Sequence, residues 1–506
     1  MSRFIHIAIT AALAASSPVA ESQSVNGAGG FRDEVVISGL VQPTDLAFGG
    51  NGHVFVAEKR GTVQLFEDLH DSTPTQVLDI RTAVHNYWDR GLLGLEIHPD
   101  YPDSPWLYVL YTEDAPPGES PPWWGQADED GDTCLDPPGP QDSGCVTGGI
   151  VARVLIDPIL LTAGPPEILV SGWCQQFPSH SVGDLVFGTD GALYVSSGEG
   201  AAAHAVDTGQ FGHDYWGQNP CGDPIDEGGA LRAQDLITPD DPTGFNGTIL
   251  RLDPDTGAAL PNNPLVGGDT TDDDRIIAFG LRSPFRFAVD PNTSSLYVAD
   301  VGWDSFEEVN EITDPTDGVV ENFGWPCREG NATQAGYAPT ALCQLLEAGG
   351  DPVGTLTQPL LAISHSAPPD PARCTASAAY LTGIAVSGGA YPAPWTDSLF
   401  VTDAGSGCLW AMSRGKDHAA DPASIMTFPV RLLGAVALVD GPGGDLFYPN
   451  LYVGRIHRLR SDPTLIFADD FEYATYRWST VTGKAHNPAA TPDQKASQAV
   501  ATLFRE

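Results

Sequence analysis

The stretch LVFGTDGALYVSSGEG (residues 185–200) decides the fold class, because it places two short apolar runs on either side of a Thr-Asp-Gly turn. Within residues 193–196, Leu and Val alternate with Tyr and Ser, the period of two that is typical of a β-strand. An Asp-Gly turn between two such runs indicates a β-hairpin. The stretch therefore predicts an antiparallel strand–turn–strand unit.

Similar units recur along the chain, at residues 46–66, 95–112, 287–302, 398–412 and 445–459. Radial repetition of such units leaves few exposed sheet edges. We therefore predict an all-β protein, a six-bladed β-propeller of four-stranded antiparallel blades over residues 30–460. Two stacked β-sandwiches are the alternative.

Three segments fall outside the repeated pattern. Residues 113–148 and 201–245 are rich in Gly, Pro and acidic residues and lack periodicity, so we expect them to be loop insertions. Residues 461–506 are expected to form a C-terminal extension beyond the propeller.

The N-terminus and the cysteines point to export. Residues 1–20 begin with an Arg, continue through an apolar run and end in small residues, which is typical of a signal peptide. No later apolar run reaches the roughly 20 residues of a membrane span, so we expect a secreted or periplasmic protein without an integral membrane segment. An even number of cysteines, eight, suggests disulfides. Proximity in sequence suggests the pairs Cys134–Cys145, Cys174–Cys221, Cys327–Cys343 and Cys374–Cys408.

The charge balance excludes some classes of partner. Acidic residues number 66 and basic residues 24, for a formal net charge of −42. A surface of this sign repels phosphate backbones and anionic lipid, so nucleic-acid binding is not expected.

One acidic stretch has the spacing of a calcium loop. The segment ADEDGDTCLD (residues 127–136) offers carboxylates at alternate positions around a glycine, as hard oxygen ligands for calcium require. The candidate metal ligands are Asp128, Asp130, Asp132 and Asp136. The alternative is an acidic loop without an ion.

His180 is the candidate catalytic residue. It stands just ahead of the hairpin of residues 185–200, and loops of this kind gather at one end of a propeller's channel. Histidine exchanges a proton near neutral pH, so it suits the role of general base. A single histidine is more often structural, and the role assigned to His180 depends on a family resemblance.

Several motifs carry that resemblance. RGLLGLEIHPDYPDSPWLYVLYT (90–112), FGLRSPFRFAVDPNTSSLYVADVGWDSFEEVNEI (279–312) and NFGWPCREG (322–330) resemble the glucose/sorbosone dehydrogenase family of soluble quinoproteins. The likeness extends from about Val41 to Leu459 and is greatest to the branch that shares features with hedgehog-interacting propellers. The resemblance implies oxidation of a sugar hydroxyl with pyrroloquinoline quinone (PQQ) and calcium, and transfer of electrons to an external acceptor.

The resemblance also implies roles for particular residues. His180 matches the general base, and Arg282 matches the arginine that faces the quinone. The backbone carbonyls of Gly302 and Trp303 match the pair that holds the cofactor's calcium. Asp89 stands where sugar oxidases of this family often have Gln. Cations for the three carboxylates of PQQ are sought among Arg90, Arg251, Arg282, Arg286 and Arg328.

Three departures from the family pattern keep a second function open. Asp184 stands where the family commonly has Arg or Gln, Ser283 where it has Asn, and Thr248 where it has Lys. The chain also has only four lysines. The first hypothesis is an exported dehydrogenase that oxidises an aldose or a related sugar. The alternative is a non-catalytic, calcium-containing propeller that binds a glycan or a protein.

Overall fold

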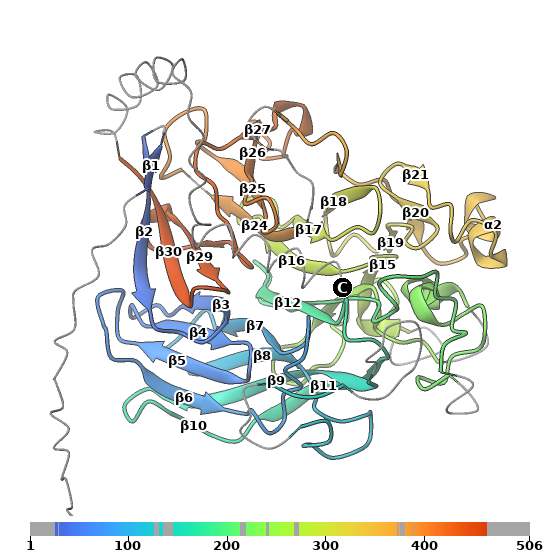
Figure 1. Cartoon of the computed structure of the whole chain (residues 1–506), viewed down its shortest axis with the longest axis horizontal. Helices are drawn as coiled ribbons and strands as arrows, with labels where there is room; N and C mark the ends of the chain where they lie inside the picture. Colours follow the sequence, from blue (N-terminus) through green and yellow to red (C-terminus); the bar gives the residue numbers. More distant parts are fainter. Residues whose placement is uncertain are drawn as a thin grey trace, which may run out of the picture.

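A computed structural model describes residues 26–462, apart from residues 29, 126–130, 135–144, 213–218, 239–241, 268–272, 372–373, 375–379 and 388 (Figure 1). The expected signal peptide, nearly all of the C-terminal extension, and Asp128, Asp130 and Asp136 of the expected calcium loop lie outside these residues.

The described residues form β-sheets almost throughout. Three sheets have four strands: β3 (Pro43–Phe48), β4 (Val54–Glu58), β5 (Thr62–Phe66) and β6 (Thr75–Asp79); β16 (Pro284–Val289), β17 (Leu296–Asp300), β18 (Phe306–Ile312) and β23 (Leu361–Ser364); β24 (Leu381–Ser387), β25 (Ser398–Asp403), β26 (Leu409–Ser413) and β27 (Met426–Thr427). Two sheets have five: β7 (Leu92–Ile97), β8 (Trp106–Thr112), β9 (Thr147–Asp157), β10 (Thr162–Ala163) and β11 (Glu167–Gln175); β1 (Asn26–Ala28), β2 (Phe31–Ser38), β28 (Val439–Asp440), β29 (Leu446–Asn450) and β30 (Arg455–Ser461).

One sheet has six strands, β12 (Val182–Phe187), β13 (Leu193–Ser197), β14 (Thr248–Leu252), β15 (Ile276–Phe279), β19 (Glu321–Asn322) and β22 (Thr355–Leu356), and β20 (Arg328–Glu329) pairs with β21 (Ala332–Thr333). The described helices are short: η1 (Gly229–Ile237), η2 (Asp273–Arg275), α2 (Ala341–Glu347), η3 (Pro422–Ser424) and η4 (Pro442–Gly444). Among the described residues, no helix has the length and apolar character to cross a membrane.

The inner strands of the sheets meet in a closed ring. Strand β7 contacts β3 and β12, β16 contacts β12 and β24, and β28 and β29 complete the circle through contacts with β24 and β3. In Figure 1 these strands lie nearest the middle of the molecule, with the outer strands radiating from them. The ring closes where β2 pairs with β30 in antiparallel fashion. Phe31 of β2 lies opposite Ser461 of β30.

The all-β propeller with mainly antiparallel sheets is therefore confirmed, and four-stranded blades fit roughly, but the expectation of six such blades is not met. Strand number varies from four to six, and β19 pairs in parallel with both β15 and β22. The strands beyond four include the two-residue β10, β19 and β22, the three-residue β1 and the nine-residue β11.

The hairpin of residues 185–200 forms as its sequence predicts. Phe187 pairs with Leu193 across a turn in which Gly191 has a φ of 79° and the Asp190 carboxylate accepts the amide of Ala192 at 3.1 Å. All five residues of β13 are buried, because its two faces pack against different neighbours. Leu193 joins one apolar cluster and Tyr194 another, as expected for a sheet that lies between two others.

The disulfides pair as proximity suggested. The bonds are Cys134–Cys145, Cys174–Cys221, Cys327–Cys343 and Cys374–Cys408, so all eight cysteines are paired. The first lies in the expected insertion of residues 113–148, and the second ties the expected insertion of residues 201–245 to β11.

We expect replacement of both Cys327 and Cys343 by Ser to lower the free energy of unfolding by about 3 kcal/mol, because the bond closes a loop of 16 positions in the unfolded chain. Urea denaturation of the oxidised protein and the variant measures the difference. Equal stability of the two proteins, or labelling of the denatured, unreduced protein by a thiol reagent, would contradict the prediction.

Candidate functional site

The candidate site lies at the end of the ring where the inner strands begin. Asp89 and Arg90 precede β7, His180 precedes β12, and Arg282 precedes β16. Because these strands stand side by side around the channel, residues just before them come together although they are far apart in sequence. The ring thus explains why four of the candidate residues meet.

Backbone strain collects at this end. Gln42, Trp88 and His180 have φ angles of 48°, 49° and 50°, in the left-handed region that larger residues seldom adopt. Such conformations persist where the surrounding structure enforces them, and they are frequent at functional sites.

His180 is paired with a buried carboxyl group. Its Nδ1 lies 3.0 Å from Oε1 of Glu199, and the other oxygen of Glu199 accepts the indole N–H of Trp325. Both residues of the His180–Glu199 pair are buried. When Glu199 is ionised, its carboxylate accepts from Nδ1–H, which is the tautomer that leaves the lone pair on Nε2.

The electrostatics keep this imidazole neutral. Burial, together with the positive charge of Arg282, holds the pKa of His180 well below its ordinary value. Burial raises the pKa of Glu199 to about 7, against the opposing effect of Arg282. At neutral pH the imidazole of His180 is therefore uncharged.

Arg282 and Asp89 flank His180. The guanidinium of Arg282 donates through Nη1 to the carbonyls of Val301 and Gly302, at 3.0 and 2.6 Å, and lies 5.5 Å from the ring of Trp325. Asp89 accepts the backbone N–H of His180, and burial raises the pKa of the Asp89 carboxyl to about 7.

The segment that carries Gly302 and Trp303 is fixed by one carboxylate. Oε1 of Glu329 accepts the backbone amides of Trp303, Asp304 and Ser305, each at 2.8 Å, and that of Phe306 at 3.2 Å. A Cβ at Gly302 would stand 1.6 Å from the Phe306 carbonyl oxygen, so only glycine fits there. The carbonyl of Gly302 already accepts from Arg282.

Two of the other candidate arginines serve the protein interior. Arg90 is fully buried and donates to the carbonyls of Cys145, Gln175 and Phe177, at 2.7, 3.0 and 2.7 Å, so it anchors the loop that leads to His180. Arg286 lies two residues inside β16 and donates to carbonyls of three segments around the inner ring, those of Thr44, Leu93 and Val436. It also pairs with Asp184, at 3.2 Å.

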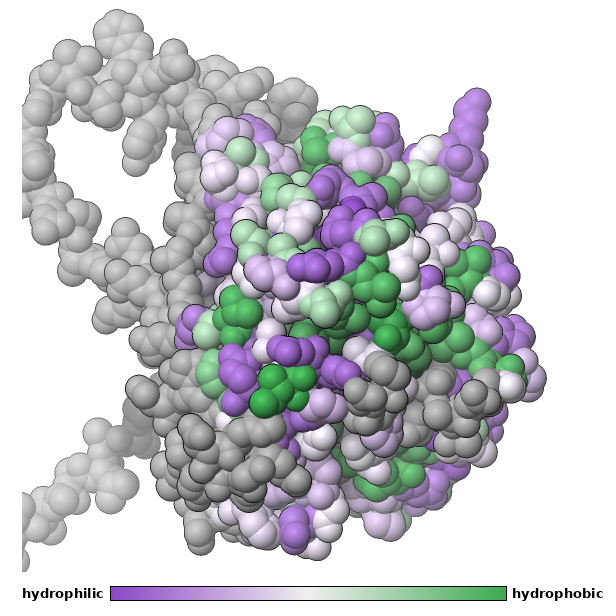
Figure 2. Space-filling model, turned by 90° about the vertical axis from the view of Figure 1, so that its right-hand side faces the viewer, coloured by the Kyte–Doolittle hydropathy of each residue, from purple (hydrophilic) through white to green (hydrophobic). Residues whose placement is uncertain are grey.

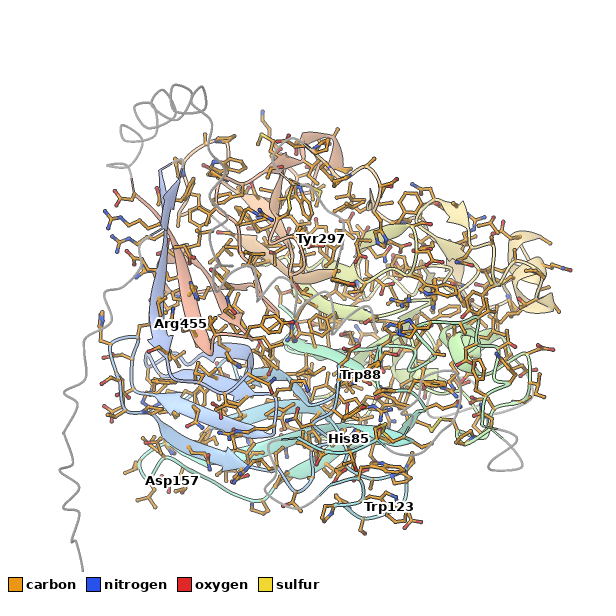
Figure 3. All side chains as sticks on the ribbon, viewed as in Figure 1. His85, Trp88, Trp123, Asp157, Tyr297 and Arg455 are labelled. Carbon is orange, nitrogen blue, oxygen red and sulfur yellow. A yellow bond between two sulfur atoms is a disulfide. The ribbon has the colours of Figure 1, made fainter. Side chains whose placement is uncertain are left out.

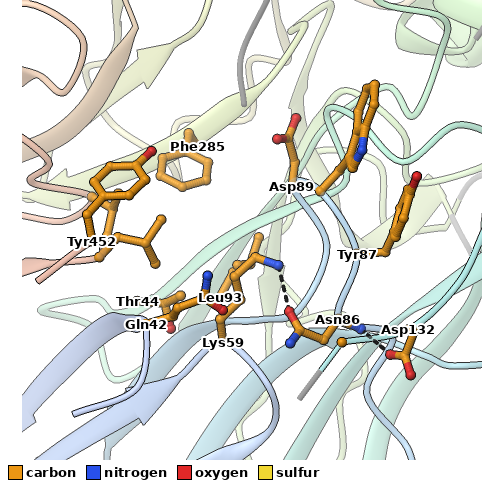
Figure 4. Close-up of a pocket in the computed structure, with 14 residues that line it drawn as sticks. Gln42, Thr44, Lys59, Asn86, Tyr87, Asp89, Leu93, Asp132, Phe285 and Tyr452 are labelled. Atoms are coloured by element: carbon orange, nitrogen blue, oxygen red, sulfur yellow. Dashed lines mark hydrogen bonds between the residues drawn. The ribbon is translucent and has the colours of Figure 1, made fainter. Parts of the chain in front are cut away.

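A pocket of about 290 Å³ opens at the same end of the ring (Figure 4). Asp89 belongs to both the pocket and the surroundings of His180. The pocket wall is largely aromatic on one side and polar on the other; its residues include Gln42, Thr44, Lys59, Asn86, Tyr87, Trp88, Asp89, Leu93, Asp132, Phe285 and Tyr452. Such a mixture suits a ligand with an apolar face and several hydroxyl groups.

Lys59 is the cation of this pocket, and sequence reasoning missed it. Its Nζ donates to Oδ1 of Asn86 at 2.6 Å (Figure 4). Burial lowers the pKa of Lys59 to about 8, while Asp89 and Asp132 act in the opposite direction. The scarcity of lysines in the chain was the one available signal, but nothing in the sequence placed Lys59 beside Asp89.

Of the four candidate ligands in the expected calcium loop, only Asp132 is described. Its carboxylate accepts the backbone N–H of Asn86 at 2.5 Å, and it lies beside the pocket, close to His85 and Asp114. The calcium loop itself stays a prediction.

A closed ring of antiparallel sheets with a polar site before its inner strands defines a β-propeller with a ligand site at the end of its channel. The chain belongs to the glucose/sorbosone dehydrogenase family, whose model matches residues 40–218 and 222–350.

The relatives include proteins with different names. The chain is 23% identical to the HIPL2 protein of Arabidopsis thaliana over 76% of this chain and 52% of that one. It is 24% identical to quinoprotein glucose dehydrogenase B of Acinetobacter calcoaceticus, over 64% of this chain and 57% of that one. It is 25% identical to human hedgehog-interacting protein, over 53% of this chain and 33% of that one. The chain thus spans about half the length of the first two relatives.

Solved structures support the fold. The soluble aldose sugar dehydrogenase from Escherichia coli superposes with a TM-score of 0.55 at 20% identity, covering 85% of this chain and 99% of that one. The PQQ-bound aldose sugar dehydrogenase from Streptomyces coelicolor gives a TM-score of 0.54 at 19% identity, covering 85% and 98%.

Proposed function

We propose that this protein is an exported oxidoreductase that oxidises a hydroxyl group of an aldose or related sugar, with His180 as the general base. The observation that carries the proposal is the His180–Glu199 pair, with Nδ1 and Oε1 3.0 Å apart. With Nδ1–H donating to Glu199, the neutral imidazole would take the hydroxyl proton at Nε2 as the carbon gives up a hydride. General-base catalysis of this kind typically contributes about 10²–10⁴-fold to the rate.

The aromatic pocket supports a sugar as the substrate. Tyr87 and Trp88 lie nearly parallel, with ring planes 9° apart, and Phe285 and Tyr452 line the same cavity. Apolar faces of this kind pack against the C–H face of a pyranose, while Gln42, Asn86 and Asp89 offer partners for its hydroxyls (Figure 4).

PQQ is the hydride acceptor that the family implies, and calcium is the ion that polarises it. The donors of the site fit an anionic group of this kind. Nε of Arg282 is buried without a hydrogen-bond partner among the described residues, and Lys59 adds a second cation nearby. Arg282 and Lys59 would hold carboxylates of the quinone, and Trp303 and Gly302 would offer backbone carbonyls to calcium.

The disulfides bear on the compartment. Four disulfide bonds are typical of an oxidising environment, which supports secretion or a periplasmic location and an electron acceptor external to the chain.

We expect the purified protein, incubated with PQQ and Ca²⁺, to retain the absorbance of the quinone through gel filtration at about one equivalent. Arg282→Gln should weaken retention because it removes the cation next to His180, whereas Arg328→Gln, at a surface ion pair with Glu347, should leave it unchanged. Absence of the quinone from the wild-type protein after gel filtration would contradict the proposal.

A second candidate function is supported by how the arginines are used. Four of the five arginines considered for the quinone are engaged elsewhere: Arg90, Arg251, Arg286 and Arg328. The Gly302 carbonyl already accepts a hydrogen bond from the guanidinium of Arg282. A calcium ion bound to this carbonyl would therefore lie close to a positive charge. A propeller that binds a glycan or a protein without the quinone would show saccharide or partner binding and no retention of PQQ.

The side of the molecule shown in Figure 2 does not point to one binding surface for a partner. On the side of the molecule shown in Figure 2, hydrophobic and hydrophilic residues are interspersed. The net charge of −42 favours partners without strong negative charge.

A further inference from the structure

Three potential metal ligands meet beside the pocket. His85, Asp114 and Asp132 each offer one donor atom, and these three atoms lie within 4.8 Å of one another. His85 and Asp114 are buried and Asp132 is partly exposed, which leaves a path for an ion from the pocket side. His85 is fully buried, and Figure 3 labels its position in the view of Figure 1.

The backbone fixes this arrangement. The amide of His85 donates to the carbonyl of Thr112 at 2.9 Å, and the amide of Asp114 donates to the carbonyl of Ala83 at 2.9 Å, so the two segments run antiparallel. Val84 and Glu113 form the bridge between them.

Asp132 is fixed to the same segment by a reciprocal pair of contacts with Asn86. The Asp132 amide donates to the Asn86 carbonyl at 3.1 Å, and the Asn86 amide donates to the Asp132 carboxylate at 2.5 Å. The disulfide Cys134–Cys145 holds the chain immediately beyond. The three ligands are thus held by main-chain contacts rather than by one another.

Surrounding groups orient the side chains. The two oxygens of the Asp114 carboxylate accept the amides of Trp123 and Trp124, each at 3.1 Å. Nε2 of His85 lies 3.1 Å from the carbonyl oxygen of Thr133, which places a fourth donor atom, an oxygen, next to the imidazole. Outer contacts of this kind are what align metal ligands.

The chemistry of the set favours a transition metal over calcium. The set combines one imidazole with two carboxylates, so it offers one nitrogen and two oxygen donors. Calcium takes six to eight oxygens, whereas zinc takes four ligands of mixed nitrogen and oxygen type.

We propose that His85, Asp114 and Asp132 form a binding site for a divalent transition-metal ion, with zinc as the best match. This ligand set shares only Asp132 with the calcium loop expected at residues 127–136, and it is independent of the quinone. The ion would fasten the segment that carries Trp123 and Trp124 to the wall of the pocket at Asp132.

The test uses the full chain, freed of metal by a chelator and dialysed against zinc. We expect about one equivalent of zinc by elemental analysis, and with Co²⁺ the visible absorption of an ion bound by nitrogen and oxygen ligands. Asp114→Asn and Asp132→Asn should each weaken zinc binding, measured by titration calorimetry, at least about 100-fold, since even the loss of an outer contact costs about 10–100-fold. Asp100→Asn, at an exposed aspartate remote from the cluster, is the matched control.

Near-ultraviolet circular dichroism of the variants separates loss of binding from loss of fold. The proposal is wrong if the wild-type protein retains no zinc, if Asp114→Asn retains it as tightly as Asp100→Asn, or if equimolar Ca²⁺ displaces it. The last result would return Asp132 to an all-oxygen calcium site.

Discussion

His180→Asn is expected to lower kcat for sugar oxidation by about 10²–10⁴-fold, equivalent to about 3–5 kcal/mol of barrier, while folding and quinone binding stay nearly intact. Asparagine keeps a polar group of similar reach beside Glu199 but cannot accept the proton. The imidazole lies before β12 rather than within a strand, so its replacement disturbs no sheet hydrogen bond. Steady-state kinetics with PQQ, Ca²⁺ and an artificial electron acceptor measure the effect.

His70→Asn is the matched control, because His70 is exposed and remote from the inner strands. It should leave kcat unchanged. Full activity of His180→Asn with the quinone bound would refute the assignment of the base. If the wild-type protein fails to bind quinone, the binding function takes precedence and His180 becomes a residue that contacts the ligand.

The same base sets the pH dependence. Only neutral imidazole accepts the proton, so activity is lost as pH falls through the pKa of His180. Burial and Arg282 hold that pKa well below the usual 6.5, so the acid limb caused by His180 should lie below pH 6.5. A profile of kcat/KM against pH with a His180-dependent limb above pH 6.5 would contradict this environment.

The second large effect is expected from Arg90→Met, which should lower the free energy of unfolding by about 3–5 kcal/mol. The guanidinium donates to the carbonyls of Cys145, Gln175 and Phe177, and methionine fills similar space without a donor. Each buried carbonyl left unpaired costs about 1–3 kcal/mol, partly offset by relaxation.

Urea denaturation of the oxidised protein measures this loss. Arg81→Met is the control, since the pair of Arg81 with Asp79 is partly exposed and such pairs contribute about 0–1 kcal/mol. A loss below about 1 kcal/mol for Arg90→Met would mean that water or rearranged chain satisfies these carbonyls.

The sequence predicted the propeller and the placement of His180 because both depend on local patterns. Strand alternation and turn residues define hairpins, and the family motifs fix their order. Blade size was less predictable, because strands such as β19 and β22 have only two residues and no periodicity to detect.

The contact of His180 with Glu199 could not be predicted from the sequence, because it depends on the register of two strands. From the turn, the pairing of Phe187 with Leu193 extrapolates to Gly200 opposite His180. A register shift between Val182 and Leu185 moves the pairing by one residue, and beyond the strands the His180 side chain meets that of Glu199. Trp325, which lies between β19 and β20, donates to the other oxygen of Glu199. No local sequence pattern predicts a contact between residues so far apart in the chain.

The role of Arg286 was hidden for a related reason. In sequence it is one more arginine in the motif that contains Arg282, but it faces inward from β16. Its partners come from β3, from β7 and from the segment before β28, so they are known only once the ring is closed. Asp184, read in sequence as a departure from the family, is the counter-charge of Arg286.

The pairing of β2 with β30 has a consequence for synthesis. Strand β2 is made early and pairs with β30, so one of its edges stays without its partner until Arg455–Ser461 has been synthesised. Contacts between such distant segments form slowly, because a long loop must close first. The N-terminal edge is therefore the part of the nascent chain most in need of protection by a chaperone before the ring can shut.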